Sequence, residues 1–192
     1  MWTAFRPTAS TGSYAGAMRV LVTGGVRSGK SRHAAGLLEG SDHVTVVAPG
    51  PVADGGDPDW DHRVARHRAH RPAGWETVET VDLASAIGAA AGPVLVDCLG
   101  TWVTAILDRA ELWDAPMDAA HGVVDQHVAA VREAVRDHDD EVVLVTNEVG
   151  YGVVPSHRSG GVFRDLLGAV NQGVAEACDE VHLVVCGRVL RL

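Results

Sequence analysis

The stretch "RVLVTGGVRSGKSRHAAGLLEG", residues 19–40, is the most informative part of the sequence about the fold. Its first five residues form a β-branched run typical of a buried strand, and from Ser31 onward apolar side chains recur at helical spacing. Between these segments, Gly24, Gly29, Lys30 and Ser31 match the pattern G-x-x-x-x-G-K-[ST]. A glycine loop in this context points backbone N–H groups inward at the positive end of the helix. The stretch therefore predicts a phosphate-binding loop.

The length and composition predict one globular domain. The chain has 192 residues, of which 46% are hydrophobic and 21% are charged, a balance that can bury a core without a disulfide or a metal. The formal net charge of −9 argues against a protein that binds nucleic acid through a broad positive surface. Cys98, Cys178 and Cys186 form no CxxC pair, so we expect free thiols, no zinc site and a cytoplasmic location.

The beginning of the chain differs from the rest. Residues 1–17 are small and polar and lack the apolar run of a secretory signal, so we expect a disordered leader followed by a single domain over 18–192. Met18 immediately precedes the first strand, and translation that starts there would omit the leader. No stretch reaches the roughly 18 apolar residues of a membrane span, so none is expected.

Strand-like and helix-like segments alternate from residue 19 to the C-terminus. After the first strand we expect strands at 43–49, 75–79, 93–98, 141–150 and, last, 180–187, and helices at 31–40, 60–70, 81–91, 100–113, 117–138 and 160–178. With the phosphate loop, this order predicts an α/β P-loop NTPase fold of the RecA-like type, a three-layer α/β/α arrangement around a mostly parallel sheet. Ligands of such sheets bind at the carboxyl ends of the strands.

Four residues are expected to act on nucleotide phosphates and Mg²⁺. Lys30 should reach the β and γ phosphates, and Ser31 should hold Mg²⁺. Asp97, at the end of "VLVD", is the expected carboxylate for Mg²⁺, with a helix N-cap as its alternative role. Glu148, in "VTNEVG", is expected to be a base for the attacking hydroxyl or a second metal ligand, and the alternative is a turn residue.

The segment "HRVARHRAHRP", residues 62–72, is rich in cations for an acidic protein. It contains His62, Arg63, Arg66, His67, Arg68, His70 and Arg71. A metal site is disfavoured because the arginines repel a cation and no carboxylate or cysteine lies beside His67 and His70. A solvated basic face is an alternative. We favour a neutral imidazole that attacks a nucleotide phosphate while arginines stabilise the charge, which predicts nucleotidyl transfer.

Six stretches together resemble one enzyme family. They are "VLVTGGVRSGKSRHAA", "RPAGWETVE", "VLVDCLGTWVT", "VLVTNEVGYGVVPSHR", "FRDLLGAVNQ" and "VHLVVCG". From Met18 to the C-terminus the chain resembles the bifunctional adenosylcobinamide kinase/adenosylcobinamide-phosphate guanylyltransferases of cobalamin biosynthesis. The resemblance implies phosphorylation of adenosylcobinamide with ATP or GTP. It then implies transfer of GMP from GTP through a guanylylated histidine, giving adenosylcobinamide-GDP and pyrophosphate.

The resemblance also assigns residues. In the family the guanylylated histidine stands four residues before the arginine of an Arg-Pro pair. Here the pair is Arg71-Pro72, so the rule assigns His67, and His70 is the alternative. Arg27 is expected to support the β and γ charges as pyrophosphate leaves. The family forms homotrimers with this histidine near a subunit boundary. The expected nucleotide-binding residues are Gly24, Gly25, Val26, Arg27, Ser28, Gly29, Lys30, Ser31, Arg71 and Asp97.

Two positions depart from the family pattern. Ala105 stands where the family usually has an asparagine, and Gly161 stands where it usually has an arginine. The run "SGG", residues 159–161, predicts a more mobile loop over the site. Two alternative functions stay open: a P-loop switch whose nucleotide changes partner binding, and a small-molecule kinase without guanylylation, for which Gly161 is the only hint in the sequence.

Overall fold

The computed structural model describes residues 17–51, 56, 58, 61–62, 64–65 and 72–192. Its elements are β1 (Arg19–Thr23), α1 (Lys30–Leu37), β2 (Thr45–Ala48), β3 (Glu76–Glu79), α3 (Leu83–Ala89), β4 (Val94–Asp97), α4 (Leu99–Arg109), α5 (Met117–Asp137), β5 (Val142–Val145), α6 (Arg158–Ala175), β6 (Glu180–Val185) and β7 (Arg188–Arg191). The expected leader, apart from Ala17, and most of the expected helix over 60–70 lie outside the described residues. Within the described ranges, no helix combines the length and the apolar character needed to cross a membrane.

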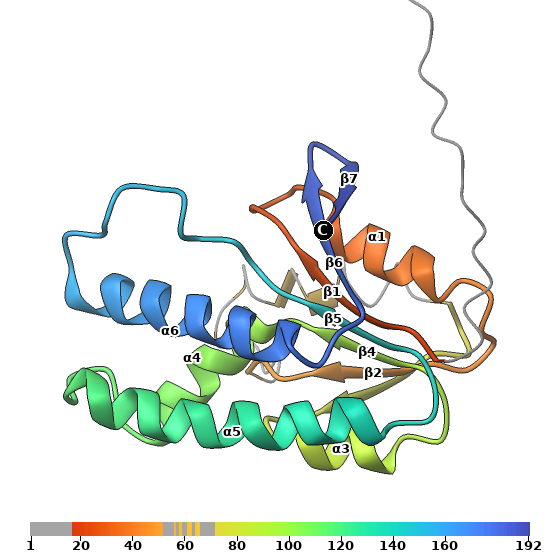
Figure 1. Ribbon diagram of the computed structural model, residues 1–192, viewed down its shortest axis with the longest axis horizontal. Coiled ribbons are helices and arrows are strands. Elements are labelled where there is room, and N and C mark those ends of the chain that lie inside the picture. The colour runs from red at the N-terminus through yellow and green to blue at the C-terminus, as the bar shows by residue number, and fades with distance from the viewer. Residues whose placement is uncertain (1–16, 52–55, 57, 59–60, 63, 66–71) are drawn as a thin grey trace, which may run out of the picture.

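One seven-stranded sheet organises the described residues. Its strand order is β3-β2-β4-β5-β1-β6-β7, and Figure 1 labels the strands from β2 to β7 in this order. All neighbouring strands pair in parallel except β7, which is antiparallel to β6. β1 is an interior strand with β5 on one side and β6 on the other. The prediction of a mostly parallel sheet is confirmed, and the segment that follows β1 emerges between two neighbouring strands.

Helices cover both faces of the sheet, because strand side chains point alternately to the two faces. α3, α4, α5 and α6 cover one face and α1 covers the other (Figure 1). In β4, Val94 and Val96 pack into the larger core with α3 to α6, whereas Leu95 packs into the smaller core with Ala34 of α1. The predicted three-layer α/β/α arrangement is therefore confirmed.

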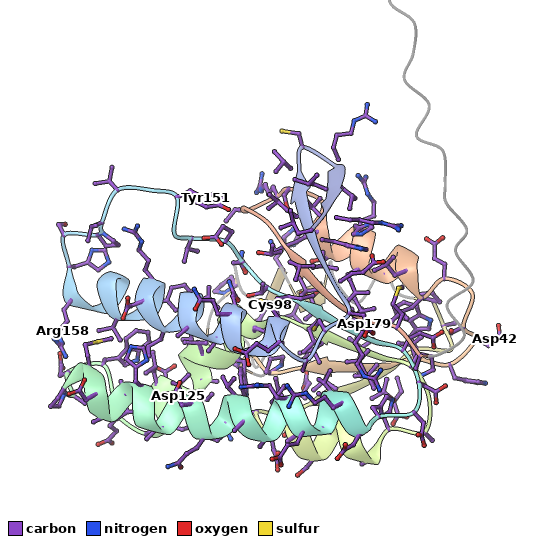
Figure 2. The ribbon with its side chains drawn as sticks, in the orientation of Figure 1. Asp42, Cys98, Asp125, Tyr151, Arg158 and Asp179 are labelled. Atoms are coloured by element: carbon purple, nitrogen blue, oxygen red, sulfur yellow. The ribbon has the colours of Figure 1, made fainter. Side chains whose placement is uncertain are left out.

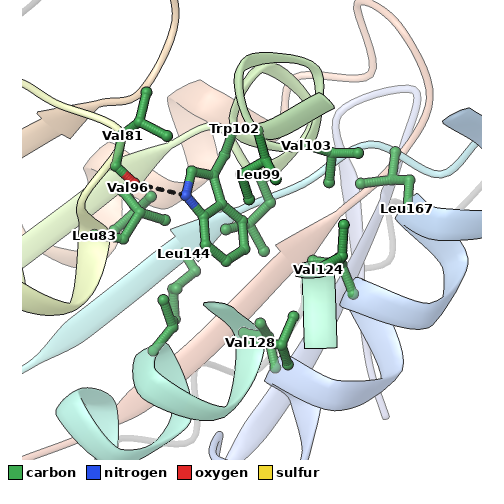
Figure 3. Packing of buried hydrophobic residues seen from close by; sticks show 14 of the residues in the cluster. Val81, Leu83, Val96, Leu99, Trp102, Val103, Val124, Val128, Leu144 and Leu167 are labelled. Carbon is green, nitrogen blue, oxygen red and sulfur yellow. Dashed lines mark hydrogen bonds between the residues drawn. The ribbon is translucent and has the colours of Figure 1, made fainter. Parts of the chain in front are cut away.

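Trp102 occupies the larger core. Its side chain is 1% exposed, and its Nε1–H donates to the Val81 carbonyl oxygen at 2.8 Å (Figure 3). Valine and leucine side chains surround the ring, so this bond satisfies the only polar group of the indole. It ties α4 to the segment that precedes α3.

β7 is a strand that the sequence did not predict, since the last strand was expected at 180–187. In the structure β6 ends at Val185, and a turn at Cys186 and Gly187, whose φ angles are 50° and 73°, reverses the direction of the chain. All four residues of β7 are exposed. This edge strand therefore lacks the alternation of buried and exposed side chains by which strands are recognised in a sequence.

Residues 159–161, which were expected to form a mobile loop, belong to α6 instead. The helix begins at Arg158, and the Gly161 N–H donates to the His157 carbonyl oxygen at 3.3 Å. Glycine weakens a helix locally. The helix nevertheless buries an apolar stripe that includes Val162 and Leu166, and this packing outweighs the propensity of its first turn. The connection between β5 and α6 consequently ends before residue 158.

Candidate active site

The phosphate loop connects β1 to α1 and depends on two glycines. Gly24 has a φ of 156°, and a Cβ atom there would collide with the carbonyl oxygen of Val184 in β6. Gly29 precedes α1 in the left-handed conformation, with a φ of 99°, and no described side chain caps the helix. The first N–H groups of α1 therefore keep their hydrogen-bonding capacity for an anion.

Lys30 and Ser31 open α1, as their predicted roles require. The Nζ of Lys30 donates to the Gly25 carbonyl oxygen at 3.3 Å, so this side chain folds back over the loop. Val26 and Arg27 form an exposed tip, in which Val26 is 81% exposed and Arg27 has a φ of 56°. Arg27 is thus an exposed cation on the glycine loop.

Both predicted carboxylates lie at the same edge of the sheet as the loop. Asp97 is the last residue of β4, in register with Val145 of β5. Glu148 follows β5, and its N–H donates to the Gly24 carbonyl oxygen at 3.2 Å. One Glu148 carboxylate oxygen accepts the Gly150 N–H at 2.6 Å, which orients the side chain. The parallel strands thus bring Asp97 and Glu148, which are distant in sequence, to the phosphate loop.

A polar network that the sequence analysis did not single out supports this edge. Thr146 is 0% exposed and donates its hydroxyl to the Asn171 side-chain oxygen at 2.6 Å, and the Asn171 amide donates to the Asn147 carbonyl oxygen at 3.1 Å. Cys98 donates to the Asn147 side-chain oxygen at 3.7 Å. The network ties the ends of β4 and β5 to α6. The sequence does carry a signal for this network, because Thr146 and Asn147 are polar residues that directly follow the apolar run of β5.

Cys98, not Asp97, is the N-cap residue of α4. The alternative role of Asp97 as the cap of that helix is therefore wrong. Burial raises the pKa of the Cys98 thiol, with the Asp97 charge as a further cause, so the thiol stays protonated and can donate.

The loop after Glu148 exposes apolar side chains. Tyr151, Val153 and Val154 are 84%, 95% and 71% exposed, and Figure 2 shows Tyr151 on this loop. Arg164 of α6 donates to the Gly150 carbonyl oxygen at 2.7 Å and anchors the beginning of the loop. Exposed apolar groups of this kind are available to an apolar part of a ligand.

Of the other residues that the sequence analysis named, Ala105 and Gly161 lie elsewhere in the fold. His67 and Arg71 lie outside the described residues. Ala105 is partly buried and packs against the larger core. Gly161 lines an open cleft of about 570 Å³ between the beginnings of α5 and α6, with Met117 and Arg158 among its other lining residues.

This combination of strand, glycine loop and uncapped helix defines a P-loop nucleotide-binding protein. One solved structure with this fold comes from work titled "Structural and biochemical analysis of a prototypical ATPase from the type III secretion system of pathogenic bacteria". It matches with a TM-score of 0.58 and 12% identity, over 86% of this chain and 50% of that chain, and shows the fold alone.

Within this class, the family model described as cobinamide kinase / cobinamide phosphate guanyltransferase matches residues 20–192. The chain therefore belongs to this family, and the resemblance seen in the six motifs is confirmed. Two relatives, from Salmonella typhimurium and Escherichia coli, are both named bifunctional adenosylcobalamin biosynthesis protein CobU. Each is 40% identical, covering 88% of this chain and 97% of the relative. The bifunctional adenosylcobalamin biosynthesis protein CobP of Pseudomonas aeruginosa is 37% identical, and the match covers 88% of this chain and 94% of the relative.

Proposed function

We propose that the protein catalyses both reactions of its family. It phosphorylates the hydroxyl of adenosylcobinamide with ATP or GTP, and it then transfers GMP from GTP to the product. The observation that carries this proposal is the family match over residues 20–192 in a chain with an intact phosphate loop. A nucleotide switch would not need the further motifs, which extend well beyond the loop.

In the kinase step the chain's residues bind and orient the phosphates. The loop N–H groups and the first turn of α1 hold the β and γ phosphates, and Lys30 neutralises their charge. The oxygen of the substrate hydroxyl attacks the γ phosphorus, and the nucleoside diphosphate leaves. Glu148 accepts the proton of that hydroxyl during the attack. This role requires the carboxylate to turn toward the substrate, because one of its oxygens accepts the Gly150 N–H.

Mg²⁺ fits the donors at this edge. The described residues contain no group of three or more His, Cys, Asp or Glu side chains that could hold a metal. A nucleotide-bound Mg²⁺ needs only one or two protein oxygens, because phosphates and waters supply the others. Ser31 and Asp97 supply a hydroxyl and a carboxylate at the carboxyl edge of the sheet. When bound, the ion neutralises charge on the phosphates.

In the guanylyltransferase step His67 is the nucleophile. Its imidazole nitrogen forms a bond to the α phosphorus of GTP while the bond to the β-phosphate oxygen breaks and pyrophosphate leaves. A phosphate oxygen of adenosylcobinamide phosphate then attacks the same phosphorus and releases His67. Arg27 and Arg71 stabilise the anionic groups during transfer. The assignment of His67 rests on its spacing from the Arg71-Pro72 pair.

Labelling with GTP tests this function. The protein is mixed with Mg²⁺ and GTP labelled at the α phosphate and then denatured. We expect a bound label that is labile in acid and stable in base, as for a phosphoramidate, and that is lost in His67→Asn but kept in His70→Asn. If a protein that binds GTP takes up no label, guanylyl transfer is refuted. Transfer of γ-phosphate to adenosylcobinamide would then distinguish a kinase from a switch.

The family resemblance also supports proposals about the state of the protein in the cell. We propose a cytoplasmic homotrimer in which residues 18–192 form a single domain and residues 1–17 a leader. Sedimentation equilibrium should give three times the chain mass of 20.1 kDa. Removal of residues 1–17 should leave this mass ratio and the unfolding transition unchanged.

A further inference from the structure

A chain of hydrogen bonds joins α1 to β6 one helical turn after the phosphate loop. Nε2 of His33 lies 2.9 Å from Nδ1 of His182, and Nε2 of His182 lies 2.6 Å from a carboxylate oxygen of Glu180. His182 is 0% exposed. Arg191 of β7 lies opposite His182, and its Nε is 3.8 Å from the same Glu180 oxygen. The proposed reactions give none of these residues a role.

The partners determine where the hydrogens lie. The Glu180 carboxylate can only accept, so Nε2 of His182 carries a hydrogen and donates it. A neutral His182 then accepts at Nδ1, and His33 donates from Nε2. Each hydrogen bond is therefore donated in the same direction: His33 donates to His182, and His182 donates to Glu180.

α1 needs an anchor that leaves its N-terminus open. A side-chain cap or an acidic residue in the first turn would compete with phosphate for the free N–H groups. The helix instead has Gly29 as its N-cap residue and no acidic residue in its first turn. His33 lies three residues after Lys30, and its own N–H donates to the Gly29 carbonyl oxygen at 3.0 Å. Its ring can thus hold the first turn from the side facing β6.

The β6–β7 hairpin also holds the phosphate loop directly. The Gly187 N–H, in the turn of the hairpin, donates to the Ser28 carbonyl oxygen at 2.8 Å. β6 consequently supports α1 through His182 at one point and the loop through the hairpin turn at another. The hairpin is thus connected both to the glycine loop and to the first turn of α1.

We infer that Glu180, His182 and His33 form a positioning relay through which the C-terminal hairpin directs Lys30 and Ser31 toward the bound phosphates. The three are positioning residues: His33 belongs to α1, His182 contacts His33, and Glu180 contacts His182, so they act on the phosphates only through α1. A misplacement of about 1 Å can lower a rate on the order of 100-fold. The interaction of Lys30 with the phosphates strengthens as charge develops in the transition state. Loss of the relay should therefore lower kcat more than nucleotide affinity.

Substitutions at His33 in the full-length protein test the relay. In His33→Leu we expect kcat for phosphoryl transfer to fall about 10- to 100-fold, while the KM for the nucleotide changes by less than about threefold. In His33→Gln the side-chain amide can donate in place of Nε2, and we expect kcat to return to within about threefold of the wild type. Unfolding curves of each variant show how much of it is folded in the assay.

His138→Leu is the matched control. His138 is also buried, at 8% exposure, and its Nε2 donates to the Gly92 carbonyl oxygen at 3.0 Å, but it lies at the amino edge of the sheet, before β5. We expect it to lower stability without changing kcat of the folded fraction. The inference is overturned if His33→Leu keeps the wild-type kcat, or if its kcat falls only in proportion to the unfolded fraction, as expected for the control. It is also overturned if His33→Gln has a kcat as low as that of His33→Leu.

Imidazole ¹⁵N spectra of the wild-type protein give a second test that needs no variant to fold. At about pH 7.5, above the ordinary pKa of histidine, we expect both His33 and His182 to carry hydrogen on Nε2. Hydrogen on Nδ1 of His182 would overturn the relay. The inference rests on the proposed kinase activity only for its rates. An inactive wild type would refute the proposed function, whereas the spectra would still test the relay.

Discussion

Gly24→Ala should destabilise the protein, whereas Gly25→Ala in the same loop should not. A Cβ at Gly24 would fall against the carbonyl oxygen of Val184 and 2.8 Å from the hydroxyl of Ser28. The carbonyl belongs to β6, which is hydrogen-bonded to β1, so it cannot rotate away as a side chain can. At Gly25 no atom of the described residues lies within 4 Å of the added Cβ.

The size of the effect follows from two contributions. Inserting a methyl group into a closed site costs about 1–3 kcal/mol, and a β-carbon on a rarely adopted backbone conformation costs about 1–3 kcal/mol. We expect Gly24→Ala to lower the free energy of unfolding by about 3 kcal/mol, which for a chain of this length lowers the melting temperature by about 6–12 °C. Gly25→Ala should change that free energy by less than about 1 kcal/mol.

Urea unfolding, monitored by circular dichroism and tryptophan fluorescence, measures the difference in the free energy of unfolding between the two variants. The protein is free of nucleotide in this assay, because a bound ligand would stabilise the two variants to different degrees. Equal free energies of unfolding for Gly24→Ala and Gly25→Ala would refute the steric reasoning. A Gly24→Ala variant that loses only nucleotide binding, with unchanged stability, would refute it as well.

Three further measurements test the core, the thiols and the response to pH. Trp102→Phe should lower the free energy of unfolding by about 2 kcal/mol, because the buried Val81 carbonyl loses its donor; a urea midpoint equal to that of the wild type would contradict this. Iodoacetamide at about pH 8 should label the exposed Cys186 and spare Cys178, because burial raises the pKa of the Cys178 thiol to about 12; peptide mass spectrometry would show the sites. Burial lowers the pKa of His33 below 6.5, so the unfolded chain takes up the proton first, and the free energy of unfolding should fall as the pH drops below about 6.5. His33→Gln should lose less stability than the wild type over that range.

The phosphate loop and the family could both be predicted from the sequence alone. The phosphate loop is one contiguous stretch, and its glycines, its lysine and the start of its helix act locally, so their pattern is visible without the fold. For the same reason β1 was predicted at residues 19–23, where the structure has it. The fold class followed from alternating strands and helices, and the family followed from motifs spread along the chain.

Which residues contact the loop depends on the tertiary structure. Glu148 contacts Gly24 because β5 lies next to β1, and His33 meets His182, 149 residues away, because β6 lies on the other side of β1. β7 has no buried face and left no periodic signal in the sequence. Strand order depends on how the helices pack on the two faces of the sheet, and local propensity and periodicity do not specify that packing. The loop could therefore be predicted from local sequence, whereas its supports could not.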